Sequence, residues 1–323
     1  MNTKHCTILA VLSCFFIISP IVFSNTPSPE DVKNYKRAAL QGDALAQCNL
    51  GSCYYNGYGV ERNPQEAVLW YKKAAIQREP EALINLGICY MIGSGVEKNP
   101  QEAVQCFRKA AEQGRATAQY YLGVCYYNGD GVKENPQEAM RWFRKAAEQG
   151  EPEAQFYLGN LYCGGNREEK NLQEAVRWYR KAAEQGHGTA QYNLGVFYRN
   201  GYGVKENPQE AVRWLRKAAK QGHASAQFNL GLCYDEGYGV KGNPEEAARW
   251  WIKAAGQGLD SAQLCLGFCY EHGVGVEKDP QEAVRWYRKA AKQGNLKAIK
   301  NLEVIQSSQS GKEPQKEVIP SKS

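Results

Sequence analysis

The sequence is poor in the residues that most catalytic and metal sites require. Histidine accounts for only 4 of 323 residues, and three of them, His187, His223 and His272, lie beyond residue 24. A nucleophile–base pair needs a Ser or Cys beside a His, and none of these histidines belongs to a recognisable motif of that kind. Glu is plentiful but recurs within Gln-Glu-Ala at equivalent positions, which a structural role explains. The sequence therefore predicts a protein that is not an enzyme and needs no cofactor.

Neither sign of charge dominates, because the sequence contains 40 Lys and Arg and 34 Asp and Glu, which give a net charge of +6. The basic residues alternate with Glu instead of forming a stripe that would follow phosphates. We therefore expect no nucleic-acid partner. Residues 237–242 carry the letters Gly-x-Gly-x-x-Gly of a phosphate loop, but they follow a predicted helix rather than a strand. The same Gly-x-Gly-Val turn recurs elsewhere in the chain, so a nucleotide site is not expected.

Long hydrophobic runs are confined to the first residues. Residues 6–23 are almost wholly apolar, follow Lys4 without an acid, and precede the polar residues 25–30. This three-part pattern is typical of a secretory signal peptide. We predict a signal peptide over 1–24, with cleavage after Ser24, and a linker over 25–30. The mature chain is then expected to be exported, periplasmic or secreted, and to hold no membrane segment.

Two alternatives remain open for the first residues. An uncleaved anchor needs about 20 apolar residues, and Pro20 interrupts this run. Residues 11–14 resemble a lipoprotein box, but apolar residues rather than a polar linker follow its cysteine. At the other end, residues 306–323 are rich in Ser, Lys, Gln and Pro and are predicted to form a disordered tail.

Internal repetition is the main property of the region between these ends. The pair Leu-Gly recurs at intervals of 36 residues without an insertion. Its glycines are Gly51, Gly87, Gly123, Gly159, Gly195, Gly231 and Gly267. Seven full units thus span about 43–294, a half unit precedes them over 31–42, and a further helical segment follows over 295–305. Repeats of this length predict a solenoid.

The third unit shows how each repeat is expected to fold. Apolar residues from Ala118 to Tyr126 recur at helical spacing, and the glycines of 128–131 end this first helix, helix A. Asn135 is suited to cap a second helix, helix B, with Pro136 at its first position and a Glu at N3 that closes a capping box. Helix B then carries its own apolar stripe up to a glycine at residue 150.

Gly123 lies inside helix A, where glycine costs about 1 kcal/mol relative to alanine. Its presence at this register in all seven units indicates a close approach of another helix, for which Ala146 and Ala147 are suitable small partners. Two short helices cannot bury their apolar stripes alone, whereas stacked units bury them continuously. The predicted fold is an all-α solenoid of seven 36-residue helix–turn–helix repeats over 31–305, with half-repeat caps.

The recurring pattern Ala-Gln-x-x-Leu-Gly-x-x-Tyr-x-x-Gly-x-Gly-Val, followed by Glu-Ala-x-x-Trp-x-x-Lys-Ala-Ala-x-Gln-Gly, resembles the Sel1-like repeat, a relative of the tetratricopeptide repeat. The resemblance extends over 31–305 and implies a right-handed superhelix whose A helices line a concave groove. It also implies a scaffold or adaptor, which in exported bacterial members often serves envelope processes or host interaction. The fourth unit departs from the pattern at 163–168, so a different turn is expected there.

The cysteines are interpreted as core residues. Five of the nine that follow the predicted cleavage site share one register, two residues after the Leu-Gly glycine: Cys53, Cys89, Cys125, Cys233 and Cys269. Packed helices lie about 8–10 Å apart, too far for most disulfides, so free thiols are expected. Cys265, Cys269 and His272 share a helix face, but without a fourth ligand no metal site is predicted. His187 and His223 are expected at a rim.

Partner contacts are predicted where the units differ. By analogy with tetratricopeptide-like stacks, the variable outward positions of helix A form the contact set, and the candidate contact residues after the helix A tyrosine are Tyr55, Met91, Tyr127, Arg199, Asp235 and Glu271. The first three are uncharged and the last three charged, which suits an extended ligand with an apolar and a charged end. Sequence drift at exposed helix ends is the alternative. A second, mostly apolar column, which includes Leu232 and Phe268, belongs either to the groove or to the core.

These observations favour an exported scaffold that binds a protein or peptide in its groove. A different hypothesis is an envelope or glycan-processing factor with catalytic activity, for which the turn at 166–170 supplies the polar cluster nearest to a candidate site. A purely structural spacer is a third hypothesis. The sequence leaves the partner and the oligomeric state open.

Overall fold

Two helices form in each repeat, and both begin and end where the sequence predicts. In the computed structural model, the N–H of Gly129 donates to the Cys125 carbonyl (2.9 Å), and Gly129 ends helix A of the third repeat with a φ of +78°. The Asn135 side chain accepts from the Glu138 N–H (3.1 Å) and starts helix B. The Glu138 carboxylate pairs with Arg141 (3.4 Å). The N-cap is confirmed, and Glu138 is engaged by Arg141 along its own helix.

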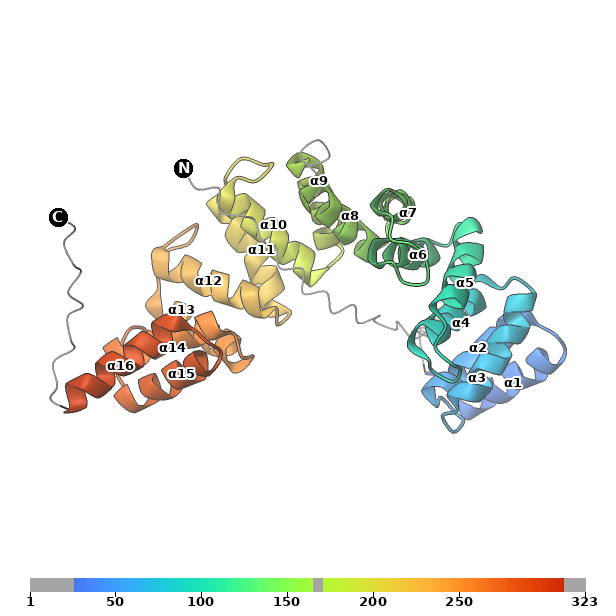
Figure 1. The fold of residues 1–323 in the computed structure, drawn as a ribbon, viewed down its shortest axis with the longest axis horizontal. Coiled ribbons are helices and arrows are strands. Elements are labelled where there is room, and N and C mark those ends of the chain that lie inside the picture. The colour runs from blue at the N-terminus through green and yellow to red at the C-terminus, as the bar shows by residue number, and fades with distance from the viewer. Residues whose placement is uncertain (1–25, 165–170, 311–323) are drawn as a thin grey trace, which may run out of the picture. The chain divides into compact units, whose positions relative to one another are not determined.

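The structure describes residues 26–164 and 171–310, which hold 16 helices and no strand (Figure 1). The A helices are α2 (Ala44–Asn56), α4 (Pro80–Ile92), α6 (Ala116–Asn128), α8 (Pro152–Gly164), α10 (Gly188–Asn200), α12 (Ala224–Glu236) and α14 (Asp260–His272). The B helices are α3 (Pro64–Ile76), α5 (Pro100–Glu112), α7 (Pro136–Glu148), α9 (Leu172–Glu184), α11 (Pro208–Lys220), α13 (Pro244–Gly256) and α15 (Pro280–Lys292). The flanking helices are α1 (Pro29–Leu40) and α16 (Leu296–Ser310). The all-α repeat fold is confirmed.

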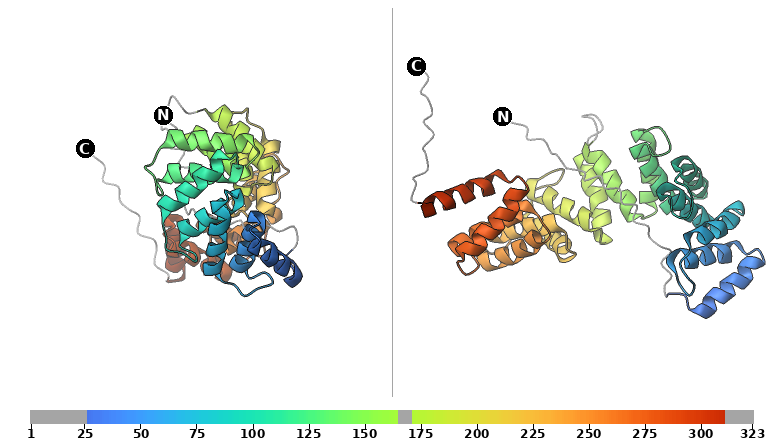
Figure 2. Two further views of the ribbon diagram at one scale, coloured as in Figure 1. Left: turned by 90° about the vertical axis from the view of Figure 1, so that its right-hand side faces the viewer. Right: turned by 60° about the horizontal axis from the view of Figure 1, so that its bottom comes forward.

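The chain divides into two units, residues 1–151 with α1–α7 and residues 152–323 with α8–α16. Within each unit a helix packs on the helices that precede and follow it in the sequence. Figures 1 and 2 agree that α14, α15 and α16 lie side by side at the end of the second unit. The predicted signal peptide and most of the fourth-repeat turn lie outside the described residues.

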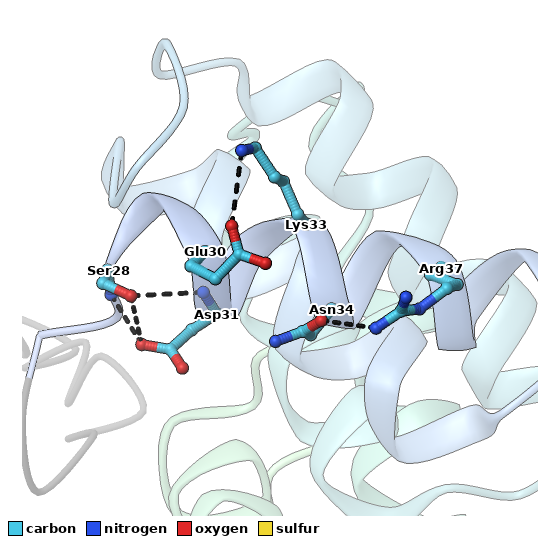
Figure 3. A network of polar contacts seen from close by, with 6 residues as sticks. All are labelled: Ser28, Glu30, Asp31, Lys33, Asn34 and Arg37. Atoms are coloured by element: carbon cyan, nitrogen blue, oxygen red, sulfur yellow. Dashed lines mark hydrogen bonds and ion pairs between the residues drawn. The ribbon is translucent and has the colours of Figure 1, made fainter.

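Both flanking helices extend beyond the bounds that the sequence indicates. Helix α1 begins at Pro29, two residues early, because Ser28 caps it: the Asp31 N–H donates to Ser28 Oγ (3.2 Å), and the Ser28 N–H donates to Asp31 Oδ2 (2.9 Å) (Figure 3). The Ser28 hydroxyl also donates to Asp31 Oδ2 (2.7 Å), and this bond together with the one from the Ser28 N–H lowers the pKa of the Asp31 carboxyl. Helix α16 continues to Ser310, so the residues from 306 to 310, predicted as tail, are helical.

The glycine inside each A helix lies against a large side chain of the B helix in the same repeat. A Cβ atom added to Gly123 would lie 2.7 Å from Cδ1 of Phe143, which is fully buried. The predicted close approach is confirmed, but the partner is an aromatic ring and not Ala146 or Ala147. The same contact recurs in the other repeats as Gly51–Tyr71, Gly87–Phe107, Gly159–Tyr179, Gly195–Leu215, Gly231–Trp251 and Gly267–Tyr287.

Buried glutamines join successive repeats. In the fifth repeat, Gln191 is 3% exposed; its Nε2 donates to the Ala183 carbonyl of the preceding B helix (3.0 Å), and its Oε1 accepts from Gln221 (3.0 Å). Gln119, Gln227 and Gln263 also donate to an alanine carbonyl of the preceding B helix. Gln221 lies in the same repeat as Gln191, and the equivalent pairs within other repeats are Gln77–Gln47, Gln149–Gln119, Gln185–Gln155, Gln257–Gln227 and Gln293–Gln263. Buried amides with partners specify one alignment, because an offset would leave them unsatisfied.

Arg78 is a strained exception at the end of the first repeat. It has a φ of +62°, and among the described residues it is the one non-glycine residue with a positive φ. The six later repeats place glycine at this register, with φ between +85° and +96°. A left-handed backbone conformation costs a residue with a Cβ about 1–2 kcal/mol.

Replacing Arg78 should therefore stabilise the protein. We expect Arg78→Gly to raise the free energy of unfolding by about 1 kcal/mol, since relief of strain exceeds the entropy that glycine adds to the unfolded chain. The reverse change in the next repeat, Gly114→Arg, should lower it by a similar amount. Urea unfolding followed by circular dichroism measures both. A lower midpoint for Arg78→Gly would contradict the assignment of strain.

Candidate functional site

Met91 is the predicted contact residue that the structure corrects. It is only 4% exposed and packs in the core of the first unit. It lies on one helical stripe with Ile84 and Ile88, at i, i+4 and i+7, and all three side chains are buried. Since this stripe faces the core, Met91 offers no side chain to a partner.

Arg199 is engaged between repeats. Its Nη2 donates to Glu236 Oε2 in the next repeat (2.8 Å), and its guanidinium lies 5.3 Å from the ring centroid of Tyr238. The Tyr238 hydroxyl lies within hydrogen-bond distance of the Arg199 carbonyl (3.1 Å) and of Glu206 Oε1 (2.9 Å), and it can donate its one proton to either acceptor. Arg199 therefore connects the fifth repeat to the sixth.

Glu271 is engaged within the seventh repeat. Its Oε2 accepts a hydrogen bond from the hydroxyl of Tyr287 (2.6 Å), which is fully buried on helix B. Burial and this carboxylate raise the pKa of Tyr287 well above its usual value. The side chain of Glu271 thus has a structural partner that the sequence pattern did not indicate.

Tyr55 and Tyr127 are half-buried at the ends of α2 and α6. The Arg62 guanidinium lies 5.9 Å from the ring centroid of Tyr55, and the Tyr127 ring lies 6.5 Å from that of Phe143. Their partial exposure is compatible with the predicted contacts, which stay a prediction at these two positions.

Asp235 is the predicted residue that lies at a pocket. A pocket of about 360 Å³ opens among α12, α14 and α16 in the second unit. Leu232, Trp251 and Phe268 supply much of its apolar lining, with Asp235 at the α12 side. Phe268 is 48% exposed and stacks on His272, with 4.2 Å between ring centroids. Two residues of the column that was left open between groove and core, Leu232 and Phe268, line this pocket.

Two side chains of the seventh repeat that line the pocket are smaller than their counterparts in the sixth repeat. Val274 occupies the register that Tyr238 holds in the sixth repeat, where the tyrosine reaches back across the preceding A helix. Cys265 occupies the register of Asn229. Both Val274 and Cys265 line the pocket. The shorter residues leave open a space that the bulkier ones would narrow.

Charges surround the pocket asymmetrically. Lys297 and Lys300 of α16 line one side and Asp235 the other. Burial raises the pKa of the Cys265 thiol to about 11; Asp235 contributes to the rise and Lys297 opposes it. At neutral pH this thiol is protonated, which makes it a poor nucleophile.

The core interpretation of the cysteine column is confirmed. Cys53, Cys89, Cys125, Cys233 and Cys269 are buried with free thiols. Burial is the main cause that raises the pKa of each, to about 12 for Cys89 and Cys125. Within residues 26–164 and 171–310, no three His, Cys, Asp or Glu side chains are grouped so as to hold a metal ion. None of the helices described there combines the length and apolarity needed to cross a membrane.

Most residues that line the pocket were not among the predicted contacts, and these include Lys297, Lys300 and Trp251. Lys300 replaces the aromatic or aliphatic residue that earlier repeats carry at this register, such as Phe228. A lysine in place of an apolar residue of the repeat pattern could therefore have indicated from the sequence that α16 contributes to a site. No such signal marked Trp251, because the other repeats carry large buried side chains at its register, such as Phe143 and Leu215.

The structural repeat coincides with the repeat of a known family. The family model described as Sel1 repeat matches residues 44–78, 80–114, 116–151, 152–187, 188–223, 224–259 and 260–295. The chain belongs to the Sel1 repeat family. Each match begins at the first residue of an A helix, so one family repeat corresponds to one A helix with the B helix that follows it.

Two solved structures resemble this Sel1 repeat protein along most of its length. One is c5321 of uropathogenic Escherichia coli, described as a protective antigen with an SLR fold, at 38% identity and a TM-score of 0.79. The match covers 86% of this chain and 60% of that one, so the chain spans less than two thirds of that structure. The other is a Sel1 repeat protein from Oxalobacter formigenes, at 36% identity, a TM-score of 0.69, and coverage of 85% and 80%. No curated protein matches the chain.

The histidines predicted at a rim have a structural role. His223 caps α12, because its Nδ1 accepts from the Ala226 N–H (3.2 Å), and its ring stacks on Tyr192, 4.7 Å between centroids. His187 caps α10 in the same way. Burial lowers the pKa of His223, and the nearby His187 contributes to this shift. Only the neutral form of His223 can accept the capping bond.

Acid should therefore weaken the cap. Because the pKa of His223 is lower in the folded state, its contribution is present above the unfolded pKa of about 6.5 and is lost as pH falls through the folded value. We expect His223→Asn, which keeps a capping oxygen, to lose less stability than the native chain between pH 7 and 5. Thermal unfolding across this range measures the slope, with His272→Asn as control. Equal slopes for native and His223→Asn proteins would count against this cap.

Proposed function

We propose that this Sel1 repeat protein is an exported, non-enzymatic scaffold that binds an extended segment of a partner protein on its A helices. The observation that carries the proposal is the open, largely apolar pocket among α12, α14 and α16, with Phe268 exposed at its edge. Apolar pockets with a few polar groups are the usual form of ligand sites. Sel1 repeat solenoids are typically protein-interaction scaffolds, which agrees with a binding role.

The chemistry of the pocket supports binding over catalysis. Its titratable groups are Asp235, two lysines and two thiols, and burial raises the pKa of both thiols, to about 11 for Cys265 and about 12 for Cys269. Acid–base catalysis at neutral pH usually requires a general base or nucleophile whose pKa lies near 7. The turn at 166–170, which the enzyme hypothesis invoked, lies outside the described residues.

Export is supported by the composition of residues 1–24. The E. coli relative is described as a protective antigen, a property of that protein which is compatible with a place accessible to antibodies. We propose an exported location for this chain, periplasmic or secreted.

A photo-crosslinking residue placed at the pocket should capture a partner in the producing cell. We expect benzoylphenylalanine at Phe268, which is 48% exposed, to form a discrete adduct with another protein. The same residue at Tyr202, 38% exposed but remote in sequence from the pocket residues, is the matched control. Mass spectrometry of the adducts is the readout. No adduct at 268, or identical adducts at both positions, would overturn the binding role.

Export is tested on the same cells. Fractionation should place the chain outside the cytoplasm, and the mass of the purified protein should correspond to a first residue of Asn25. A cytoplasmic chain that retains residues 1–24 would refute this part of the proposal.

A further inference from the structure

We propose that the pocket among α12, α14 and α16 selects a partner segment in which a large apolar side chain lies next to acidic residues. This inference rests on the proposed binding function and adds the chemistry of the partner. It is carried by three features of the pocket: its apolar floor, two uncommitted ammonium groups, and an acid on the opposite side.

The floor provides the place for the apolar side chain. Trp251 forms part of the floor and is only 4% exposed. Its Nε1 donates to the Phe228 carbonyl (3.3 Å), which fixes the position of the indole ring. Leu232 and Leu264 from successive A helices flank it, and both are half-buried. Filling this space with an aromatic or aliphatic side chain would remove apolar surface from water on both partners.

The two lysines provide the charge preference. Lys297 and Lys300 line the pocket from one face of α16 and are exposed, and no carboxylate of the described residues lies within 4 Å of either ammonium. The arginines of nearby B helices differ, because Arg249 and Arg285 each pair with a Glu three residues earlier (2.6 and 2.9 Å). Uncommitted ammonium groups beside an apolar pocket attract a carboxylate in an incoming segment.

Asp235 gives the segment a direction. It lies on the α12 side of the pocket, whereas both lysines lie on the α16 side. A carboxylate in the bound segment is therefore favoured near α16 and repelled near α12. The preferred orientation places the apolar anchor over Trp251 and the acidic residues toward α16.

The occupant is a separate protein rather than this chain's own end. Residues 317–319, Glu-Val-Ile, offer similar chemistry, but Lys316 directly precedes the acid, and Lys312 precedes Glu313. Each acid in that end thus carries a neighbouring cation, which weakens its attraction to the two lysines of α16. A protein ending at Ser310 distinguishes the two occupants.

Fluorescence anisotropy with three labelled octapeptides tests the preference. One contains Leu and Phe followed by two Glu, the second has Lys in place of Glu, and the third has Ala in place of Leu and Phe. The native chain should bind the first at least tenfold more tightly than either other peptide. Added salt should reduce this difference, because part of it is electrostatic.

Two variants connect binding to the pocket. Val274→Tyr restores the bulky residue of the sixth repeat and should weaken binding of the acidic peptide at least tenfold, whereas Ser94→Tyr, at the same register of the second repeat, should leave it unchanged. The double variant Lys297→Glu/Lys300→Glu should reverse the preference toward the Lys peptide. Its control is Lys205→Glu/Lys241→Glu, on exposed turns. Circular dichroism establishes that each variant is folded.

Equal binding of the Glu and Lys peptides, or native affinity in Val274→Tyr, would overturn the inference. If only the protein ending at Ser310 binds the acidic peptide, the chain's own end is the occupant and the inference is wrong. An adduct at position 268 together with peptides that show no preference would leave the scaffold function standing and refute this inference alone.

Discussion

The contact between a glycine of helix A and a large side chain of helix B is the constraint on which every repeat depends. Gly123 leaves space for the ring of Phe143, and the other six repeats reproduce the contact with Tyr, Phe, Leu or Trp. Glycine in a helix costs about 1 kcal/mol, whereas a fully buried aromatic ring contributes about 1.5–3 kcal/mol. The free energy gained by burying the ring therefore exceeds the cost of the glycine. The contact also brings two short helices close enough to form one layer of the core.

The same contacts explain where function resides. The glycine contacts position the helices within each repeat, and the bonds from buried glutamines such as Gln191 to a carbonyl of the preceding B helix align each repeat with the one before it. The residues that make either kind of contact are not free to vary. Binding specificity must come from the remaining positions. At the pocket, Val274 and Cys265 replace bulkier residues of the sixth repeat, and neither takes part in the glycine or glutamine contacts.

The sequence predicts the backbone far better than the surface. A period of 36 residues, the Asn caps and the glycine stops suffice for helix positions, because each acts through local backbone chemistry. The direction of a side chain at a helix end depends on its neighbours instead. Met91 turns inward with Ile84 and Ile88, and Arg199 reaches Glu236. The sequence pattern alone does not distinguish Met91 and Arg199 from an exposed residue such as Asp235. A pocket lined by small residues such as Val274 and Cys265 has no sequence motif that would reveal it.

The most direct test of this account is the sign of one stability change. In an ordinary helix, Gly→Ala raises stability by about 1 kcal/mol. At Gly123 the added methyl group would lie 2.7 Å from the buried Phe143 ring, and overpacking of this kind costs about 1–3 kcal/mol. Calorimetry of Gly123→Ala should therefore show a lower melting temperature. Phe143→Leu, which copies Leu215 of the fifth repeat, should relieve part of the loss in the double variant. A higher melting temperature for Gly123→Ala would contradict the account.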